Sequence, residues 1–314
     1  MTRLGTSDLD VSTLCLGTNV FGWTAGEAAS HAVLDAYVAG GGNFLDTADV
    51  YSAWIPGNAG GESETIIGTW LAANPAQRDD IVLATKVSQL APNKGLGRDA
   101  ILAATDASLQ RLQTDRIDLL WAHYDDADTP LEETLAAFGE LIDAGKVRAI
   151  GASNYSAQRL AEALALADRK GLPRYVALQP HYNLVEREEY EATLAPVVAE
   201  HDVAVVPYFA LAKGFLTGKY RPGGPEVDSP RAGSASAYLE HGGAEVLEAL
   251  DAVAAAHETT VAAVALAWLA AQPHVAAPIA SARTVEQLAD LLPVNALKLS
   301  DDEVAQLSGA TASA

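Results

Sequence analysis

Four side chains that can carry charge or exchange a proton follow short apolar segments of the chain. Asp46 ends one such segment with Tyr51 five residues beyond it, Lys86 ends the next, and His123 follows a third. A lysine that ends a buried strand needs an anion beside it, and Asp46 would supply that anion. The ammonium would lower the pKa of Tyr51 from about 10, so that the phenol donates a proton near neutral pH while His123 orients a carbonyl oxygen. Residue types alone leave the reaction open between carbonyl reduction and another acid/base process.

The strands and helices needed to position these side chains are indicated by two kinds of segment that alternate along the sequence. Short segments rich in Val, Ile and Leu alternate with Ala/Leu/Glu-rich segments that have helical spacing, which predicts repeated βα units. Eight apolar strands with crossover helices favour an α/β fold of the closed (β/α)8 TIM-barrel type, in which the carboxyl ends of all strands meet at one face. The predicted strands are 13–16, 43–46, 81–85, 117–121, 147–151, 175–178, 203–206 and 274–279. The predicted helices are 27–39, 62–73, 98–111, 131–144, 156–168, 188–200, 245–256, 260–271 and 284–291.

A doubly wound sheet is the structural alternative. It is disfavoured because the first strand is followed by Gly17-Thr18-Asn19 and not by a Gly-rich dinucleotide fingerprint. Residues 1–314 are expected to form a single barrel domain with two additions. Arg3-Leu4 and Leu9 to Val11 predict a small hairpin at the bottom of the barrel, and the Gly/Pro/Ser-rich stretch from Lys213 to Gly243 predicts a long loop after strand seven.

Composition excludes several classes of function. A formal net charge of -21 opposes the phosphate contacts on which nucleic-acid binding depends. The single cysteine, Cys15, allows no internal disulfide and no multi-thiolate metal site, and no metal is expected. The longest apolar stretch, 261–271, is too short to cross a bilayer, and the first twenty residues lack a signal-peptide pattern. We therefore expect a soluble cytoplasmic protein with no nucleic-acid or membrane partner.

Motifs along nearly the whole chain, from Arg3 to about Leu292, resemble those of the aldo-keto reductase family. The resemblance implies that Asp46, Tyr51, Lys86 and His123 form a catalytic tetrad. It also implies an NADPH-dependent enzyme that reduces an aldehyde or ketone to the alcohol, with Tyr51 as general acid. The shared motifs are Leu45-Asp46-Thr47-Ala48 with Tyr51, Gly61-Glu62-Ser63-Glu64, Thr85-Lys86, Ile117-Asp118-Leu119-Leu120 leading to His123, Ala144-Gly145-Lys146-Val147-Arg148, Gly151-Ala152-Ser153-Asn154, Gln179-Pro180-His181-Tyr182-Asn183, Gly214-Phe215-Leu216-Thr217-Gly218-Lys219 and Ala282-Arg283-Thr284.

The resemblance further implies where a nicotinamide dinucleotide binds. Ser153, Asn154 and Gln179 match residues that hold the carboxamide, and Tyr208 matches the aromatic ring stacked on the nicotinamide. The backbone from Leu211 to Gly214 would face the pyrophosphate. The full expected cofactor-binding set is Gly17, Thr18, Asp46, Ser153, Asn154, Gln179, Tyr208, Phe209, Leu211, Lys213, Gly214, Lys219, Arg231, Ser281, Arg283, Gln287 and Asp290.

Arg283 bears on the choice of cofactor. It follows the last predicted strand, near where the family binds the adenosine ribose phosphate, and a guanidinium suits bidentate recognition of phosphate. NADPH/NADP+ is therefore preferred over NADH/NAD+. The chain departs from the family pattern at Phe209-Ala210, where relatives commonly carry Ser-Pro, and at Leu291, where an asparagine is expected.

A small-molecule carbonyl compound is the expected partner, bound by a monomer or weak homo-oligomer. Trp23, Tyr51, Trp54 and His123 are expected to contact it, and Phe21 and Trp121 are further candidates for an apolar cleft. One rival interpretation is a nicotinamide-nucleotide-sensing regulatory subunit that binds a protein partner, because the chain also resembles potassium-channel β subunits. The other rival is a cofactor-free hydrolase or lyase with paired carboxylates drawn from Asp46, Asp49, Asp125 and Asp126.

Overall fold

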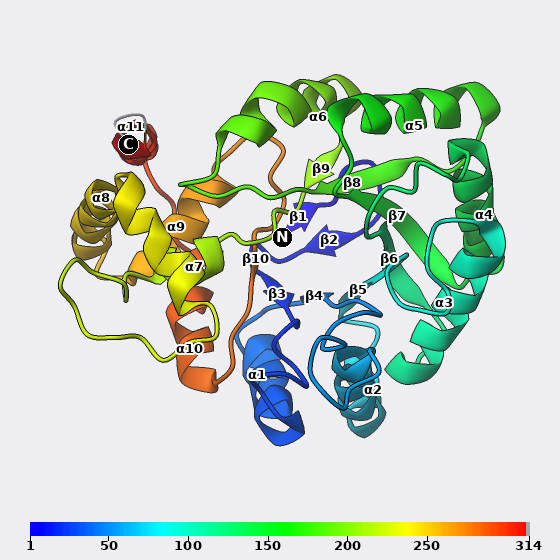
Figure 1. Ribbon diagram of the computed structural model, residues 1–314, viewed down its shortest axis with the longest axis horizontal. Helices are drawn as coiled ribbons and strands as arrows, with labels where there is room; N and C mark the ends of the chain where they lie inside the picture. Colours follow the sequence, from blue (N-terminus) through cyan, green and yellow to red (C-terminus); the bar gives the residue numbers. More distant parts are fainter. Residues whose placement is uncertain (312–314) are drawn as a thin grey trace.

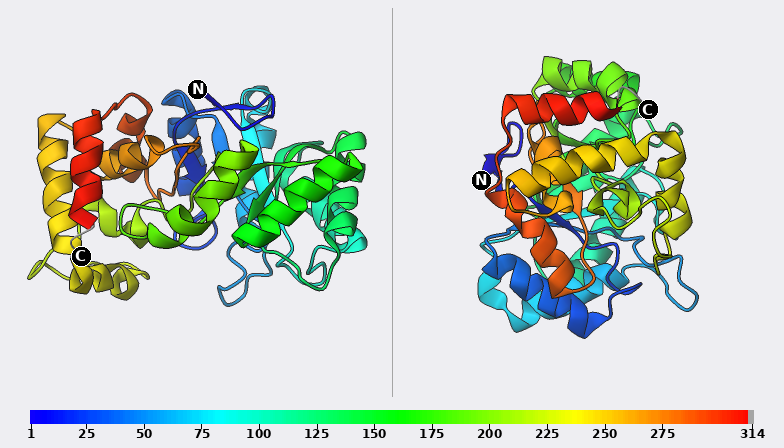
Figure 2. Two further views of the ribbon diagram at one scale, coloured as in Figure 1. Left: turned by 90° about the horizontal axis from the view of Figure 1, so that it is seen from above. Right: turned by 90° about the vertical axis from the view of Figure 1, so that its left-hand side faces the viewer.

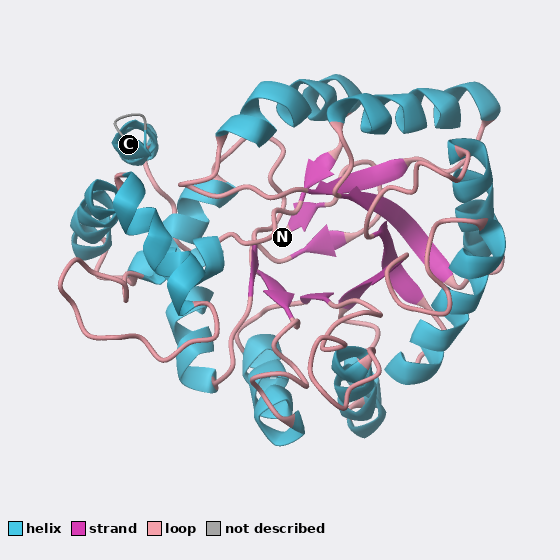
Figure 3. Cartoon of the chain, in the orientation of Figure 1, coloured by secondary structure: helices cyan, strands magenta, loops and turns pink. Residues whose placement is uncertain are grey.

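Parallel strands with apolar residues on both faces form the centre of the fold. The computed structural model, which describes residues 1–311, has eight of them in the order β10-β3-β4-β5-β6-β7-β8-β9, and they curl into a ring as predicted (Figure 3). The ring closes where the amide of Val205 donates to the carbonyl of His274 at 2.8 Å and the amide of Ala276 donates to the carbonyl of Val205 at 2.9 Å. The strands are β3 (Cys15–Gly17), β4 (Phe44–Asp46), β5 (Val82–Val87), β6 (Ile117–Ala122), β7 (Val147–Ser153), β8 (Tyr175–Gln179), β9 (Ala204–Val205) and β10 (Ile279–Ala280).

Helices cover the outside of the ring (Figure 1). Apolar residues of helices such as α4 and α5 pack into the main hydrophobic core, and both ends of α5 are capped. Ser156 begins α5 by accepting a hydrogen bond from the amide of Arg159, and Gly171 ends it with a φ of +65°. The helices are α1 (Glu27–Ala39), α2 (Glu62–Ala73), α3 (Arg98–Leu112), α4 (Leu131–Asp143), α5 (Ala157–Lys170), α6 (Ala195–His201), α7 (Ala232–Ser236), α8 (Gly243–Ala256), α9 (Val261–Ala270), α10 (Val285–Leu291) and α11 (Asp301–Thr311).

Several predicted elements differ from those in the structure. The predicted strand 274–279 is split: Val275 forms only an isolated bridge with Val205, and the regular strand is Ile279–Ala280, beyond Pro278, which has no amide hydrogen to donate. The predicted helix 188–200 opens with a π-helical turn, Tyr190–Leu194, directly before Pro196 in the first turn of α6. The long loop after strand seven contains helical turns, among them α7, and α11 was not predicted.

Side chains from the strands fill the inside of the barrel. The indole of Trp121 is buried there, and a side chain at Gly151 would place its Cβ 2.4 Å from that ring, which explains why residue 151 has none. The predicted hairpin is present as β1 (Thr2–Arg3) and β2 (Asp10–Val11), and its apolar residues pack onto this interior cluster. The hairpin closes the barrel at the end opposite α7 (Figure 2).

The part of the chain that the structure describes contains neither a single membrane-spanning helix nor a cluster of metal ligands. No single helix within residues 1–311 is long and apolar enough to span a membrane; α8 and α9 together are long and apolar enough, but they are bent by 97°. Within residues 1–311, no three His, Cys, Asp or Glu side chains come together as a set of metal ligands.

Candidate active site

Three of the four predicted catalytic side chains form one hydrogen-bonded chain at the open end of the barrel. Lys86 is ion-paired with Asp46, and both side chains are almost fully buried. The Lys86 ammonium also donates to the carbonyl oxygen of Thr47 and to the phenol oxygen of Tyr51, each at 2.8 Å. His123 lies beside them, with its ring centroid 6.1 Å from that of Tyr51.

Parallel pairing of neighbouring strands brings these residues together. Asp46 ends β4 beside β5, which carries Lys86, and the pairing continues past the strand end because the amide of Asp49 donates to the carbonyl of Lys86 at 3.1 Å. The amide of His123 donates to the carbonyl of Val87 at 3.0 Å and so extends β6 in the same way. All four side chains therefore reach the carboxyl-terminal face of the barrel, as the predicted topology requires.

A tight turn holds Tyr51 over Lys86. Ser52, the next residue, has a φ of +70°, and its hydroxyl donates to the carbonyl of Phe21 at 2.8 Å. Asn58 then donates its side-chain amide to the carbonyl of Ser52 at 3.0 Å. The loop that carries Tyr51 is thus tied down on both sides, which fixes the position of the phenol.

Burial controls the protonation of this cluster. Desolvation opposes the charge on Lys86, but Asp46 and Tyr51 hold the pKa of Lys86 above its ordinary value. Burial raises the pKa of the Tyr51 phenol, and the opposing effect of Lys86 is smaller. In this structure the expectation that Lys86 brings the pKa of Tyr51 down toward neutrality is therefore wrong, because the effect of complete burial on that pKa outweighs the effect of one neighbouring cation. Tyr51 keeps its proton at neutral pH.

His123 is a neutral imidazole. Burial, with a smaller contribution from the Lys86 charge, lowers its pKa well below the ordinary value of 6.5. Its Nδ1 is buried without a hydrogen-bond partner among the described residues. A neutral ring beside Tyr51 can donate one hydrogen bond to a carbonyl oxygen without adding a positive charge next to Lys86.

A second layer of charged groups supports the cluster from behind. Glu64 is fully buried on α2, where it accepts from the Thr85 hydroxyl at 2.5 Å and from Arg111 Nε at 2.7 Å. Asp49 is also buried, and neither of its carboxylate oxygens has a hydrogen-bond partner in the described part of the chain. Burial and the nearby Glu64 raise the pKa of Asp49 to about 7, although Arg111 acts in the other direction. Asp49 thus lies behind the site as a carboxyl that changes charge near neutral pH.

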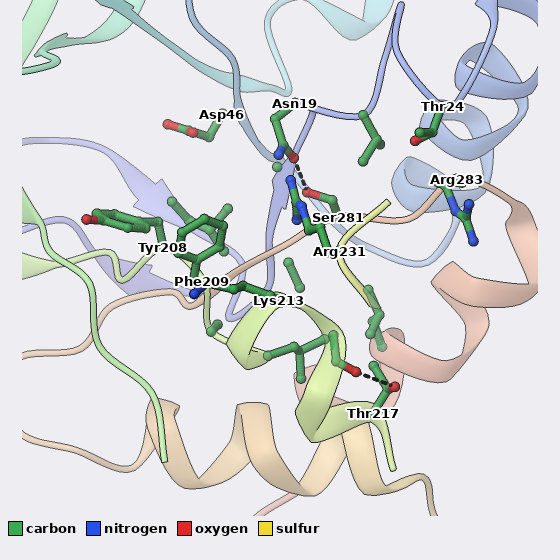
Figure 4. A pocket seen from close by; sticks show the side chains of 18 of the residues that line it. Asn19, Thr24, Asp46, Tyr208, Phe209, Lys213, Thr217, Arg231, Ser281 and Arg283 are labelled. Carbon is green, nitrogen blue, oxygen red and sulfur yellow. Dashed lines mark hydrogen bonds between the residues drawn. The ribbon is translucent and has the colours of Figure 1, made fainter. Parts of the chain in front are cut away.

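A cavity of about 820 Å³ opens above these residues. In Figure 4, Asp46 and Tyr208 lie at one end and Arg283 at the other, with Lys213 and Arg231 between them. Thr18 alone of the predicted cofactor-binding residues does not line the cavity. Its side chain is fully buried, and its hydroxyl donates to the carbonyl of Asp46, so it supports β4 and does not reach the cavity. The predicted residues that line the cavity are Gly17, Trp23, Asp46, Tyr51, Trp54, His123, Ser153, Asn154, Gln179, Tyr208, Phe209, Leu211, Lys213, Gly214, Lys219, Arg231, Ser281, Arg283, Gln287 and Asp290.

Four of the lining residues are cations that lack a carboxylate partner. Lys213, Lys219, Arg231 and Arg283 make no ion pair within residues 1–311. Burial, and then the charge of Arg283, lowers the pKa of Lys219, so these two cations are close enough to repel each other. Burial also lowers the pKa of Arg231, whose guanidinium stacks between the rings of Trp23 and Phe209, at 5.3 and 5.6 Å from their centroids. Uncompensated cations along a cleft in a protein of net charge -21 fit a polyanionic ligand.

The residues expected to hold a nicotinamide are connected to one another. Tyr208 donates its hydroxyl to the side-chain oxygen of Asn154 at 2.9 Å, and Asn154 donates to the carbonyl of His123 at 2.8 Å. Ser153 donates to the backbone carbonyl of Gln179 at 2.9 Å. The side-chain amide of Gln179 donates to Asp46 at 3.0 Å, so it links this group of residues to the Asp46–Lys86 ion pair. Gly214, with a φ of +97°, turns the backbone here in a way that other residues rarely adopt.

Aromatic side chains form the wall beside Tyr51. Trp54 packs edge-on against Trp23 at 5.6 Å and against Tyr51 at 6.3 Å, and it is 48% exposed. Tyr124, which was not predicted, lines the same cavity and is 46% exposed. Phe21 and Trp121 do not line the cavity, because both are fully buried in the core. The apolar wall is therefore formed by Trp23, Trp54 and Tyr124, which lie in loops, and not by Trp121 on β6.

The cavity is also lined by residues that were not among the predicted site residues. Asn19 accepts a hydrogen bond from the Ser281 hydroxyl at 2.7 Å, and both side chains face the cavity. Ala210 and Leu291, noted in the sequence as departures from the family pattern, also line it. Asn19 lies two residues beyond the end of β3, and Tyr124 directly follows His123. The strand-end rule that selected the tetrad could have found these two residues.

Fold and site together define a class of protein: a (β/α)8 barrel that holds Asp46, Lys86, Tyr51 and His123 at its open end, beneath a cleft lined by four cations. The aldo/keto reductase family model matches residues 13–312, and the chain belongs to that family of oxidoreductases. Protein tas of Escherichia coli is 35% identical over 97% of this chain and 95% of its own length. A probable voltage-gated potassium channel subunit beta of Arabidopsis thaliana is 35% identical over 91% of this chain and 88% of its own. Norsolorinic acid reductase B of Aspergillus parasiticus is 32% identical over 97% of this chain and 82% of its own length.

Proposed function

We propose that the protein is an NADPH-dependent reductase that converts an aldehyde or ketone to the alcohol. The observation that carries this proposal is the hydrogen-bonded chain from Asp46 through Lys86 to Tyr51, with neutral His123 beside it at the base of the cavity. A bound nicotinamide dinucleotide would supply the hydride. The protein residues would bind the substrate, hold its carbonyl and deliver the proton.

Tyr51 acts as the general acid in this proposal. Its phenol stays protonated because burial raises its pKa, and the growing alkoxide of the substrate is a stronger base than the phenolate. Lys86, which donates to the same phenol oxygen, stabilises the phenolate left behind, and Asp46 keeps Lys86 charged. His123 donates to the carbonyl oxygen and fixes the face that is reduced.

The unpaired cations support a phosphorylated cofactor. Lys219 and Arg283 lie close to each other on the side of the cavity away from Tyr51, and a phosphate on the ribose would relieve their repulsion. Lys213 and Arg231, between the two ends, would meet the pyrophosphate. Ser153, Asn154 and Gln179 would hold the carboxamide. NADPH is therefore preferred over NADH.

The test is absorbance-monitored oxidation of NADPH, with NADH in parallel, by purified protein given a panel of aldehydes and ketones. We expect consumption of NADPH that exceeds that of NADH and that falls by roughly 10²- to 10⁴-fold in Tyr51→Phe, the range for loss of one general acid. Unchanged turnover in Tyr51→Phe would remove Tyr51 from the mechanism.

A regulatory role is the second candidate, because one relative is named as a potassium channel subunit. Tight binding of NADPH with negligible turnover of every carbonyl in the panel would favour it over the reductase. Failure to bind either cofactor would instead favour the cofactor-free hydrolase or lyase.

A further inference from the structure

His181 has no role in the site described above, although it touches the ring at its centre. It follows β8 by two residues, and its imidazole stacks on the phenol of Tyr208 with ring centroids 5.4 Å apart and planes 12° from parallel. The amide of Tyr208 donates to the carbonyl of Pro180 at 3.0 Å, so the two chain segments are also joined by backbone. His181 therefore occupies one face of the ring proposed to stack on the nicotinamide.

The remaining contacts fix Tyr208 in place. Its hydroxyl is bonded to Asn154, and the ring of Phe209 meets it at 70° with centroids 5.3 Å apart. Tyr208 lines the large cavity, whereas His181 does not. The imidazole thus supports Tyr208 from behind, and the face of Tyr208 toward the cavity is the one on which a planar ligand can stack.

His181 remains accessible to protons on its far side. A second cavity, of about 570 Å³, is lined by His181 together with Leu184, Glu186 and Glu189. The charged side chains that line this cavity with His181 are Glu186, Arg187, Glu188, Glu189 and Glu191. Glu186, Glu189 and Lys213 act electrostatically on the imidazole, and the amide of Asn183 lies 3.5 Å from its Nε2. A ligand in the large cavity would therefore leave this second route to solvent open.

We propose that His181 is a positioning residue that holds Tyr208 against the nicotinamide and, when protonated, weakens binding of the oxidised cofactor relative to the reduced one. The inference rests on the proposed function. Oxidised nicotinamide carries a positive charge and the reduced ring is neutral, so an imidazolium behind Tyr208 repels only the oxidised form. Protonation of His181 thus favours release of the product cofactor.

The direction of the titration follows from the surroundings. Burial lowers the pKa of His181 below its ordinary 6.5, Glu186 and Glu189 act against this, and Lys213 adds to it. The ring is therefore neutral at pH 8 and gains its charge on acidification. Asp49 loses its charge over an overlapping pH range, since burial raises its pKa to about 7, and it needs its own control.

The test is the ratio of the dissociation constant of NADP+ to that of NADPH, measured by fluorescence titration from pH 5.5 to pH 8. Titration of the cofactor phosphate is common to both ligands and cancels in the ratio. In the wild type we expect the ratio to rise about three- to tenfold on acidification, the order for one partly screened charge pair. His181→Phe keeps the stacked ring but has no charge, so its ratio stays flat, whereas Asp49→Asn retains the rise.

A second variant tests positioning alone. His181→Gln removes the stacked ring and should weaken binding of both cofactors several-fold at pH 8, where His181→Phe binds like the wild type. A wild-type ratio that does not change with pH, or a rise that persists in His181→Phe, would overturn the inference while leaving the reductase proposal intact. Absence of binding by either cofactor at every pH would overturn both proposals.

Discussion

Loss of the Arg283 guanidinium is expected to reduce the preference for NADPH. Arg283 lines the cavity at the end away from Asp46, has no carboxylate partner in residues 1–311, and is close enough to Lys219 to lower the pKa of that lysine. A hydrogen bond to a charged group contributes about 1.5–3 kcal/mol. Because Arg283 is partly exposed and Lys219 remains, Arg283→Gln should cost near the lower end of that range, a roughly 10- to 30-fold weaker affinity for NADPH.

The assay is fluorescence titration of the variant with NADPH and with NADH. Affinity for NADH, which lacks the phosphate, should change by less than about twofold, since the lost contact is worth little without that charge. Arg169→Gln on α5 removes the same charge from an exposed position outside the cavity and serves as the matched control. An equal loss of affinity for both cofactors in Arg283→Gln, or no loss for NADPH, would refute the assignment of the phosphate to this end of the cavity.

Three further predictions test the substrate wall, the buried carboxyl and the packing. Trp54→Ala should raise KM for an aromatic aldehyde about tenfold, with the affinity for NADPH unchanged; an unaltered KM would place the substrate elsewhere. Asp49 has a pKa of about 7 in the folded protein against an ordinary 3.8, so the stability present below about pH 4 is lost as pH rises through 7, by up to about 4 kcal/mol. Thermal denaturation of the wild type should therefore show a stability that falls as the pH rises from 5 to 8. The same fall in Asp49→Asn would show that Asp49 is not its cause. Gly68→Ala would place a Cβ 2.0 Å from the carbonyl oxygen of Arg111 and should cost about 1–3 kcal/mol in urea denaturation, whereas Gly309→Ala, with nothing within 4 Å, should not; equal midpoints for the two variants would refute the clash.

The residues at the strand ends were predictable because each apolar segment of the sequence is followed by a polar residue. Apolar segments specify buried parallel strands, and the polar residue that ends each segment must then lie at the open face of the barrel. Asp46, Lys86 and His123 follow from this rule, and the structure brings them together with Tyr51. The ends of α5 depend only on nearby residues, because Ser156 caps its first turn and Gly171 ends its last turn.

Features that depend on side-chain direction or depth were not predictable. Thr18 follows β3 as a cavity residue would, but its hydroxyl turns inward to the Asp46 carbonyl and to Ser63. The pKa of Tyr51 depends on how completely the loop buries the phenol, which no neighbouring residue type reveals. The stacking of His181 on Tyr208 joins two segments about thirty residues apart in the chain, so it emerges only from the folded barrel.

Transfer of hydrogen from cofactor to carbonyl carbon is the central claim, and isotope labelling tests it most directly. Purified protein would be given NADPH with deuterium at the transferable C4 position and an aldehyde from the panel, and the product would be analysed by mass spectrometry. The predicted result is an alcohol with one deuterium on the former carbonyl carbon, absent when Tyr51→Phe replaces the wild type. An alcohol without deuterium, or no alcohol while NADPH is bound, would contradict the assignment of this barrel as a carbonyl reductase.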